Sequence, residues 1–339
     1  MFVGAKAGGF GFGWALALWA LCSVALAALI DIKDPELRKA VYRAMAKGQL
    51  EAAAGRWQES AAAYREAVEL APDQVETHHG YQDSMERLGK RAEMVAQYRS
   101  KLKRQPQNAL AYYLLGRVEA DLGEKETLLK KALELDPKMY WASYALGHCY
   151  ERQGRWEESE KAFKQALAVA GDWAEGYHAL GFCYMEQGKD ELAEAAYRKA
   201  LGINPRYVDS MVNMSVLALR KGKAAEAAEW CGKALAIEPD NPEALNNLGK
   251  AYYEQGRPRA AEKEFKKALA SKKVDNAEVK WLNLGFCYYQ MRNWEAAAAA
   301  FSKAIELNPS FAYARYCLAQ ARLRQEKPDE AWKLVKEAQ

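Results

Sequence analysis

The sequence has little proline and glycine for its length. Only 10 of the 339 residues are proline and 23 are glycine, so long segments have nothing to interrupt a helix. Half of the residues are hydrophobic, which is enough to bury a large core. Ala, Leu, Glu, Lys, Arg and Gln dominate, and these residues favour helices. The composition therefore predicts a single all-helical body.

The sequence also lacks any cysteine pair with metal-binding spacing. None of its six cysteines forms a CxxC motif, and no short disulfide-rich scaffold is present. Cys149, Cys183 and Cys287 each follow the pattern Gly-x-Cys-Tyr, which predicts equivalent positions in a repeat. We interpret them as small buried hydrophobic residues. Unpaired cysteines also argue against an oxidising compartment.

A strong net charge is absent as well. The 49 basic and 45 acidic residues leave a net charge of +4, unlike the clustered basic surface of a nucleic-acid-binding protein. We therefore expect no nucleic-acid partner. One stretch, residues 87–104, is locally basic. We interpret it as a solvated helix face, with a patch for an acidic partner as the alternative.

The single long apolar run lies near the N-terminus. Residues Trp14 to Ile30 carry no charge, and Lys6 precedes them. Together with Ala25-Leu26-Ala27, which fits an A-x-A cleavage site, they predict a signal peptide within residues 1–30. A retained membrane anchor is the rival, because extending the run back to Phe10 gives a length that can span a bilayer. We expect an exported, periplasmic or membrane-anchored protein, with cytoplasmic residence as the alternative.

Glycines and prolines recur with a shared period. The glycine intervals are 34 residues except for one of 31, and the prolines follow in step. Apolar residues lie between them at helical spacing. Each unit is therefore predicted to be a helix, a glycine turn, a second helix and a turn marked by proline. The glycines are Gly55, Gly89, Gly123, Gly154, Gly188, Gly222 and Gly256, and the prolines are Pro72, Pro106, Pro137, Pro205, Pro239 and Pro309.

The residues within each unit fit a known pattern. Trp281, Leu284-Gly285, Tyr288, Ala297, Phe301 and Pro309 match W-x2-L-G-x2-Y…A-x3-F…P. The sequence thus resembles the tetratricopeptide repeat family. That resemblance implies an all-α fold, an α-solenoid with a right-handed superhelix of about nine helix-turn-helix repeats over residues 41–339, after a lead-in at 31–40. The units begin near residues 41, 75, 109, 140, 174, 208, 242, 278 and 312.

Three units depart from the pattern. The second reads Tyr81-Gln82 in place of Leu-Gly. The third is three residues short between Gly123 and Pro137, which predicts a shortened second helix. The seventh has two extra residues between Ser271 and Asn276.

The resemblance further implies a concave groove lined by the first helix of each hairpin. Asn213, Asn247 and Asn283 share one repeat position and predict a row of amides that could hold an extended peptide by its backbone. The alternative is that each amide only bonds a neighbouring helix. Aromatic residues along the groove predict contact area for a partner. The full candidate groove set is Asn213, Asn247, Asn283, Asn246, Trp141, Tyr144, His148, His178, Phe182, Phe286, Tyr289 and Tyr316.

Motifs for catalysis are missing from the sequence. It contains no phosphate-binding loop, HExxH motif or nucleophile elbow, so we expect no enzyme and no cofactor. His148 and Cys149, with His178 and Cys183 one unit on, are the one cluster that suggests a metal, but they lie on different helix faces, so we expect none. We predict a non-enzymatic adaptor that holds a protein or extended peptide during assembly of a larger, envelope-associated complex. A self-assembling structural repeat protein and a metal-binding regulator are the alternatives.

Overall fold

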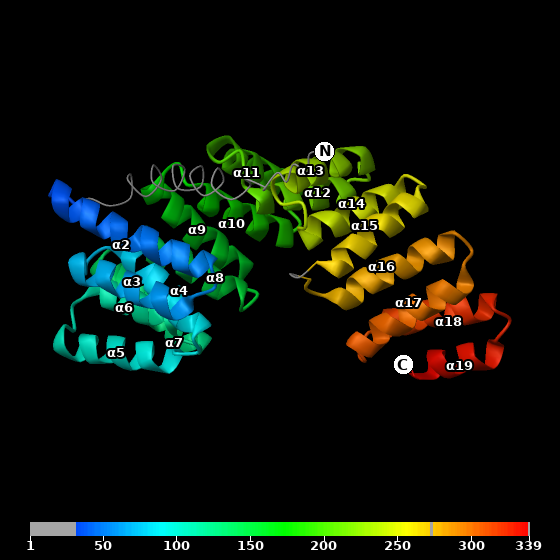
Figure 1. Cartoon of the computed structure of the whole chain (residues 1–339), viewed down its shortest axis with the longest axis horizontal. Coiled ribbons are helices and arrows are strands. Elements are labelled where there is room, and N and C mark those ends of the chain that lie inside the picture. Colours follow the sequence, from blue (N-terminus) through cyan, green and yellow to red (C-terminus); the bar gives the residue numbers. More distant parts are fainter. Residues whose placement is uncertain (1–31, 272–273, 338–339) are drawn as a thin grey trace, which may run out of the picture. The chain divides into compact units, whose positions relative to one another are not determined.

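The computed structural model describes residues 32–271 and 274–337. In this part of the chain every regular element is an α-helix, and consecutive helices lie antiparallel (Figure 1). The predicted leader, with Cys22, lies outside the described residues. The helices are α2 (Pro35–Ala53), α3 (Trp57–Leu70), α4 (Val75–Arg87), α5 (Arg91–Arg104), α6 (Ala109–Val118), α7 (Leu122–Leu135), α8 (Tyr140–Glu151), α9 (Trp156–Ala170), α10 (Ala174–Glu186), α11 (Asp190–Ile203), α12 (Val208–Arg220), α13 (Ala224–Ile237), α14 (Pro242–Glu254), α15 (Pro258–Ala270), α16 (Ala277–Gln290), α17 (Trp294–Leu307), α18 (Ala312–Arg324) and α19 (Pro328–Glu337).

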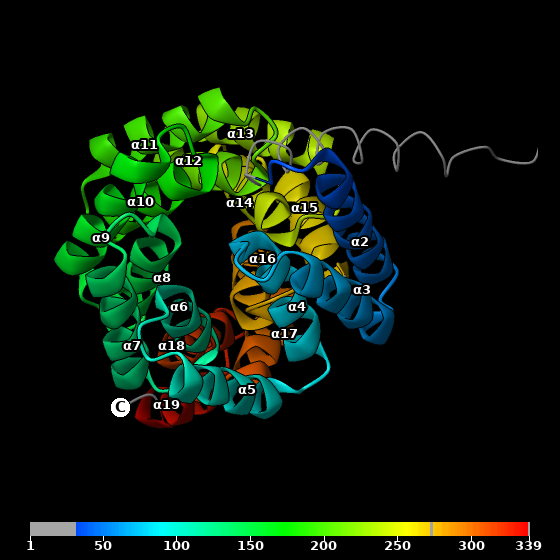
Figure 2. The ribbon, with the colours of Figure 1, turned by 90° about the vertical axis from the view of Figure 1, so that its left-hand side faces the viewer.

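The chain forms two compact units that divide between Gly154 and Arg155. Unit 1 holds α2–α8 and unit 2 holds α9–α19. Even-numbered helices are the first helices of the hairpins and odd-numbered helices the second. In unit 2, α12 and α14 lie on the inner side and α11 and α13 on the outer side (Figure 2). No helix among the described residues is both long and apolar enough to cross a membrane.

The first helix extends to the N-terminal side of Val41. Helix α2 starts at Pro35, so it takes in part of the stretch that we described as a lead-in. Asp34 caps this helix, because its carboxylate accepts hydrogen bonds from the amides of Glu36 and Leu37 at 2.9 and 3.3 Å. Proline at the first helical position adds to the start signal, since its missing N–H would have no partner there.

Glycine ends most of the first helices, as predicted. Gly89, Gly188 and Gly256, for example, have φ values of 70°, 70° and 72°. An L-residue pays a steric penalty in this left-handed conformation, and glycine does not. The turn glycines are therefore confirmed at these positions.

The prediction for the third hairpin was wrong. Helix α7 keeps 14 residues, whereas α6 has only 10, so the missing residues come from the first helix and not the second. Gly123 is the second residue of α7 and not a turn residue. The reason is local: the carboxylate of Asp121 accepts a hydrogen bond from the amide of Glu124 at 2.8 Å and starts the helix there. A full-length α7 also buries Leu129 and Ala132.

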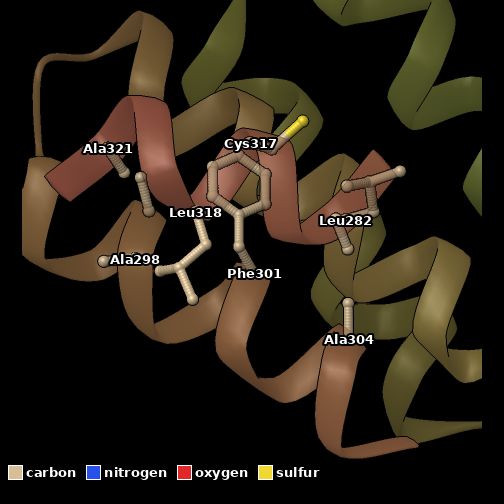
Figure 3. Close-up of a cluster of buried hydrophobic side chains, with 9 residues drawn as sticks. Leu282, Ala298, Phe301, Ala304, Cys317, Leu318 and Ala321 are labelled. Carbon is tan, nitrogen blue, oxygen red and sulfur yellow. The ribbon is translucent and has the colours of Figure 1, made fainter. Parts of the chain in front are cut away.

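In several hairpins a glycine of the first helix packs against an aromatic ring of the second helix. A Cβ atom added to Gly181 would lie 2.7 Å from Tyr197, and one added to Gly249 would lie 2.6 Å from Phe265. Gly285 and Phe301 form the same pair. The rings of Tyr197, Phe265 and Phe301 are all buried, so this aromatic position on the second helix belongs to the core. Figure 3 shows the ring of Phe301 surrounded by Leu282, Leu318 and Ala298.

Several hairpins lack this pair, and two of them show what replaces it. In α12 and α13 the positions hold Ser215 and Cys231, so a larger residue on one helix meets a smaller one on the other. In α4 the position holds Gln82, which is completely buried. Its amide donates to the carbonyl of Leu114 at 2.9 Å, so polar bonding between α4 and α6 takes the place of close glycine packing.

The cysteines of the Gly-x-Cys-Tyr pattern are buried, as predicted. Cys149 donates through sulfur to the carbonyl of Leu122 at 3.4 Å, and Cys183 donates to that of Trp156 at 3.2 Å. Each acceptor is the first residue of a preceding second helix. Burial raises the pKa of Cys287 to about 12, so its thiol stays protonated and unreactive at neutral pH.

Candidate partner-binding surface

The first helices of unit 1 carry a closed polar and aromatic cluster. The Nε2 atom of His79 lies 2.5 Å from the hydroxyl of Tyr113, which is buried. The imidazole also meets the ring of Trp141 edge-on, with centroids 4.7 Å apart. These residues come from α4, α6 and α8, so three consecutive hairpins meet through one histidine.

Charged groups complete this cluster. Arg117 donates to the Gln82 side-chain oxygen at 2.8 Å and to the Asp83 carboxylate at 2.6 Å. Burial, reinforced by the Arg117 charge, holds the pKa of His79 well below its usual value, so the ring is neutral at pH 7. Burial also raises the pKa of Glu76. The donors and acceptors of unit 1 are thus largely directed at one another.

The predicted groove residues of α8 also contact one another. The Nδ1 atom of His148 lies 2.6 Å from the carboxylate of Glu151, and the His148 ring meets that of Tyr144 edge-on at 4.5 Å. Tyr144 in turn lies 6.3 Å from Trp141 between ring centroids. Trp141, Tyr144 and His148 are therefore brought together, but as partners of each other.

The first two predicted residues of unit 2 are also engaged. The Nδ1 atom of His178 lies 3.0 Å from the hydroxyl of Ser210, and its ring contacts Tyr207 edge-on at 4.9 Å. Phe182 meets Trp156 with centroids 6.4 Å apart. Both residues are half-buried, and they connect α10 to its neighbours.

The three asparagines of the proposed row do not share one environment. Asn247 is 6 % exposed and donates to the hydroxyl of Ser215 at 3.1 Å, which links α14 to α12. Asn283 donates to the side-chain oxygen of Asn246 at 3.0 Å, which links α16 to α14. Asn213 is half-buried and makes no side-chain hydrogen bond to another described residue. The structure therefore does not display three equivalent, accessible amides.

Asn247 differs from the other two because it has a partner that the repeat pattern does not contain. Ser215 stands where most units have glycine, and its hydroxyl can reach Asn247. For Asn247 and Asn283, then, bonding between helices is what the structure shows. For Asn247, Ser215 is a sequence signal that could have indicated this, because a buried hydroxyl needs a partner.

Helices α16 and α18, the first helices of the last two hairpins, carry aromatic side chains that are exposed to solvent. We call Phe286, Tyr289, Tyr313 and Tyr316 the aromatic surface. Tyr313 and Tyr316 are 55 % and 51 % exposed, and Phe286 lies 6.1 Å from Tyr313 between ring centroids. Beneath them, Phe286 rests edge-on against the buried ring of Phe301 at 5.6 Å.

Polar side chains hold parts of this surface in place. The amide of Gln320 donates to the hydroxyl of Tyr316 at 2.8 Å, and Arg324 donates to that of Tyr289 at 3.2 Å. Leu323, which the sequence did not single out, continues the same face of α18 and is 53 % exposed. Its spacing of seven residues from Tyr316 is the signal that could have found it.

The suggested metal cluster finds no support in the geometry. Residues 32–271 and 274–337 contain no group of three histidine, cysteine or acidic side chains that could hold a metal ion. Each cysteine of that cluster donates to a backbone carbonyl, as described above.

The stacked hairpins define the class of α-solenoid repeat proteins, and comparisons specify the family. The model of the cilia and flagella-associated protein 70 middle TPR-like domain matches residues 145–271. Two tetratricopeptide repeat models match residues 280–311, and residues 128–161 and 300–333. The chain belongs to the tetratricopeptide repeat proteins, whose members bind protein or peptide partners. No curated protein matches the sequence significantly.

Solved structures agree on the fold. The APC/C hetero-tetramer Cut9-Hcn1 is 18 % identical, with a TM-score of 0.53, over 87 % of this chain and 52 % of the other. PilW, a type IV pilus biogenesis factor, is 22 % identical, with a TM-score of 0.51, over 56 % of this chain and 87 % of the other. This chain thus spans about half the length of the first structure. At these identities the likeness concerns the helical stack alone.

Proposed function

We propose that the protein is a non-catalytic adaptor that binds a partner polypeptide on the first-helix surface of unit 2. The observation that carries this proposal is the exposure of Tyr313 and Tyr316 beside the half-buried Phe286. Large aromatic side chains on a rigid helix offer contact area at a low cost in conformational entropy, which is typical of the residues that dominate protein interfaces. An isolated exposed aromatic residue would need no such explanation, but a contiguous group does.

The side chains of the aromatic surface are held in position by the residues beneath them. Phe286 lies on Phe301, and Tyr289 meets Trp294 edge-on at 4.8 Å, so the surface is backed by packed helices. A partner would therefore meet side chains that are already positioned, which reduces the entropy lost on binding. The wider role, assembly of a larger envelope-associated complex, is part of the same proposal.

The proposal is tested by affinity purification of the full-length protein with quantitative mass spectrometry. We expect the variant Tyr313→Ala/Tyr316→Ala to recover at least tenfold less of the specific partner than wild type. Each aromatic side chain that is removed contributes about 1 to 2 kcal/mol or more to the binding free energy. The matched control is Leu192→Ala/Leu307→Ala, which removes two residues of similar exposure, 49 % and 48 %, from second helices. Equal recovery of partners by both variants would refute the proposed surface.

Export or anchoring of the protein through residues 1–30 is a separate proposal, motivated by the uncharged run from Trp14 to Ile30. Cell fractionation with N-terminal sequencing of the native chain tests it. A mature chain starting just after Ala27 would indicate cleavage, and an intact chain in the membrane fraction would indicate an anchor. An intact chain in the soluble cytoplasmic fraction would refute both.

A further inference from the structure

Lys250 is an unusual residue of the first-helix surface in unit 2. It is half-buried on α14, and no hydrogen bond or ion pair joins its ammonium group to another residue of the described chain. Burial, with a contribution from the nearby Lys280 charge, lowers its pKa. The one opposing charge is Glu254, an exposed residue one turn along the same helix.

The other buried lysine among the described residues of unit 2 has partners. Lys280 is 4 % exposed, but its ammonium group lies 3.2 Å from the Glu243 carboxylate and donates to the carbonyl of Asp275 at 2.5 Å. Removing a charge from water costs several kcal/mol unless a counter-charge compensates, so Lys250 lacks the counter-charge that Lys280 has.

The neighbouring first helices carry apolar residues, Val216 and Phe286, at the repeat position of Lys250. One turn before it, Asn246 is already occupied by its hydrogen bond with Asn283. On α16, Phe286 lies one turn beyond Asn283 and belongs to the aromatic surface. On α12, the residue at the same repeat position as Lys250 is Val216. At this repeat position, then, a cation on α14 stands between apolar residues on α12 and α16.

We propose that Lys250 receives a side-chain carboxylate of a partner peptide whose flanking apolar residues pack on the aromatic surface. This proposal rests on the function proposed above and specifies the chemistry of the partner. Charge complementarity identifies the occupant: a carboxylate would supply the counter-charge that the described chain does not, in surroundings where the ion pair is poorly screened by water.

The same surface also limits the number of acidic residues. Glu175, Asp209 and Glu243 share one repeat position in the first turns of α10, α12 and α14. They lie seven residues before the position of Lys250, which is about 10 Å along a helix axis. A run of acidic residues would be repelled there, so the partner is expected to carry one carboxylate within an apolar segment.

Phage display against the full-length chain tests the proposal, with a library of random twelve-residue peptides as the probe. Panning uses wild type, Lys250→Gln, and the control Lys263→Gln, which changes an exposed lysine of α15. Wild type and the control are expected to enrich peptides with one Asp or Glu between apolar residues. Lys250→Gln is expected to lose the acidic preference.

A synthetic peptide from the selection gives the quantitative test. Replacing its acidic residue by the amide should weaken binding to wild type about tenfold, which corresponds to about 1.4 kcal/mol. Lys250→Gln should bind both peptides equally, because the interaction exists only when both charges are present. Equal binding of the two peptides by wild type would overturn the proposal, as would selected peptides that are polyacidic or lack acidic residues.

Two further readouts separate the possible failures. If the selected peptides lack an acidic residue but lose binding to Tyr313→Ala/Tyr316→Ala, the aromatic surface stands and the role of Lys250 fails. If no peptide depends on either position, the proposed function fails with it. The variant Lys250→Met is expected to unfold at the same or a higher temperature, because an uncompensated charge is removed. A fall of several degrees would mean that Lys250 stabilises the fold and would overturn the proposal.

Discussion

The first helices of unit 1 and unit 2 present different surfaces although they come from the same repeat. In unit 1, His79, Tyr113 and Trp141 contact one another, and Arg117 bonds two side chains of α4. In unit 2, the aromatic surface leaves Tyr313 and Tyr316 about half exposed. A repeat fixes the backbone and the core, whereas the side chains of the first-helix surface are free to differ.

The difference teaches where binding capacity is found in such an array. Polar groups that satisfy each other stabilise neighbouring hairpins and leave few donors or acceptors for a partner. Exposed aromatic residues that rest on packed helices keep apolar surface that a partner can cover. We therefore propose that the cluster of unit 1 stabilises neighbouring hairpins and that the surface of unit 2 binds the partner.

The largest expected effect is on stability, and it comes from removing the buried ring of Phe301 beneath the aromatic surface. Phe301→Ala should lower the free energy of unfolding of unit 2 by about 3–5 kcal/mol, because a buried ring is removed and a cavity remains. Partner binding should fall as well, since Phe286 loses its support. Urea denaturation measures the change, with Leu307→Ala on the same helix as the control, which should alter stability by less than about 0.5 kcal/mol. A similar value for both variants would contradict the packing described here.

A smaller effect is expected from opening the polar cluster of unit 1. Gln82→Ala removes a buried amide that bonds Leu114 and Arg117 and should destabilise unit 1 by about 1–3 kcal/mol. Hydrogen exchange should show reduced protection in α4 and α6, with partner binding by unit 2 unchanged. The exposed Gln107→Ala is the control. Loss of partner binding in Gln82→Ala would show that the two surfaces are not separate in function.

The smallest effect is a pH dependence that belongs to unit 1. The pKa of His79 is lowered by burial, so below the ordinary value of 6.5 the unfolded chain binds a proton that the folded chain does not. Stability is then fully present above pH 6.5 and is lost as the pH falls, by up to about 1 kcal/mol at pH 5.5 for this histidine.

Thermal unfolding at pH 7.5 and 5.5 measures this loss. His79→Gln, which keeps a hydrogen-bonding side chain but does not titrate, should lose less stability than wild type between the two values. The pKa of His78 is also lowered and that of Glu76 is raised, so their contributions remain in both proteins and cancel in the difference. An equal loss in wild type and variant would mean that His79 is protonated in the folded protein.

The amino-acid sequence by itself determined the repeat and its core. The turn glycines at a period of 34 residues, and the pairing of Gly181 on α10 with Tyr197 on α11, follow from the geometry of a single hairpin of fixed length. The burial of Cys183 follows from the same register. These features repeat because the two helices of each hairpin pack against each other in the same way.

Tertiary structure decided which groove residues are available. Asn247 and Asn283 occupy one repeat position, yet the first bonds Ser215 and the second bonds Asn246, each on a neighbouring hairpin about one repeat away. Likewise, the capping by Asp121 shortened α6 and not α7. A hydrogen bond depends on the position of both partners in space, and a periodic pattern specifies only one of them. For that reason the sequence could only predict the first-helix surface, and the packing of adjacent hairpins decides which of its residues remain exposed.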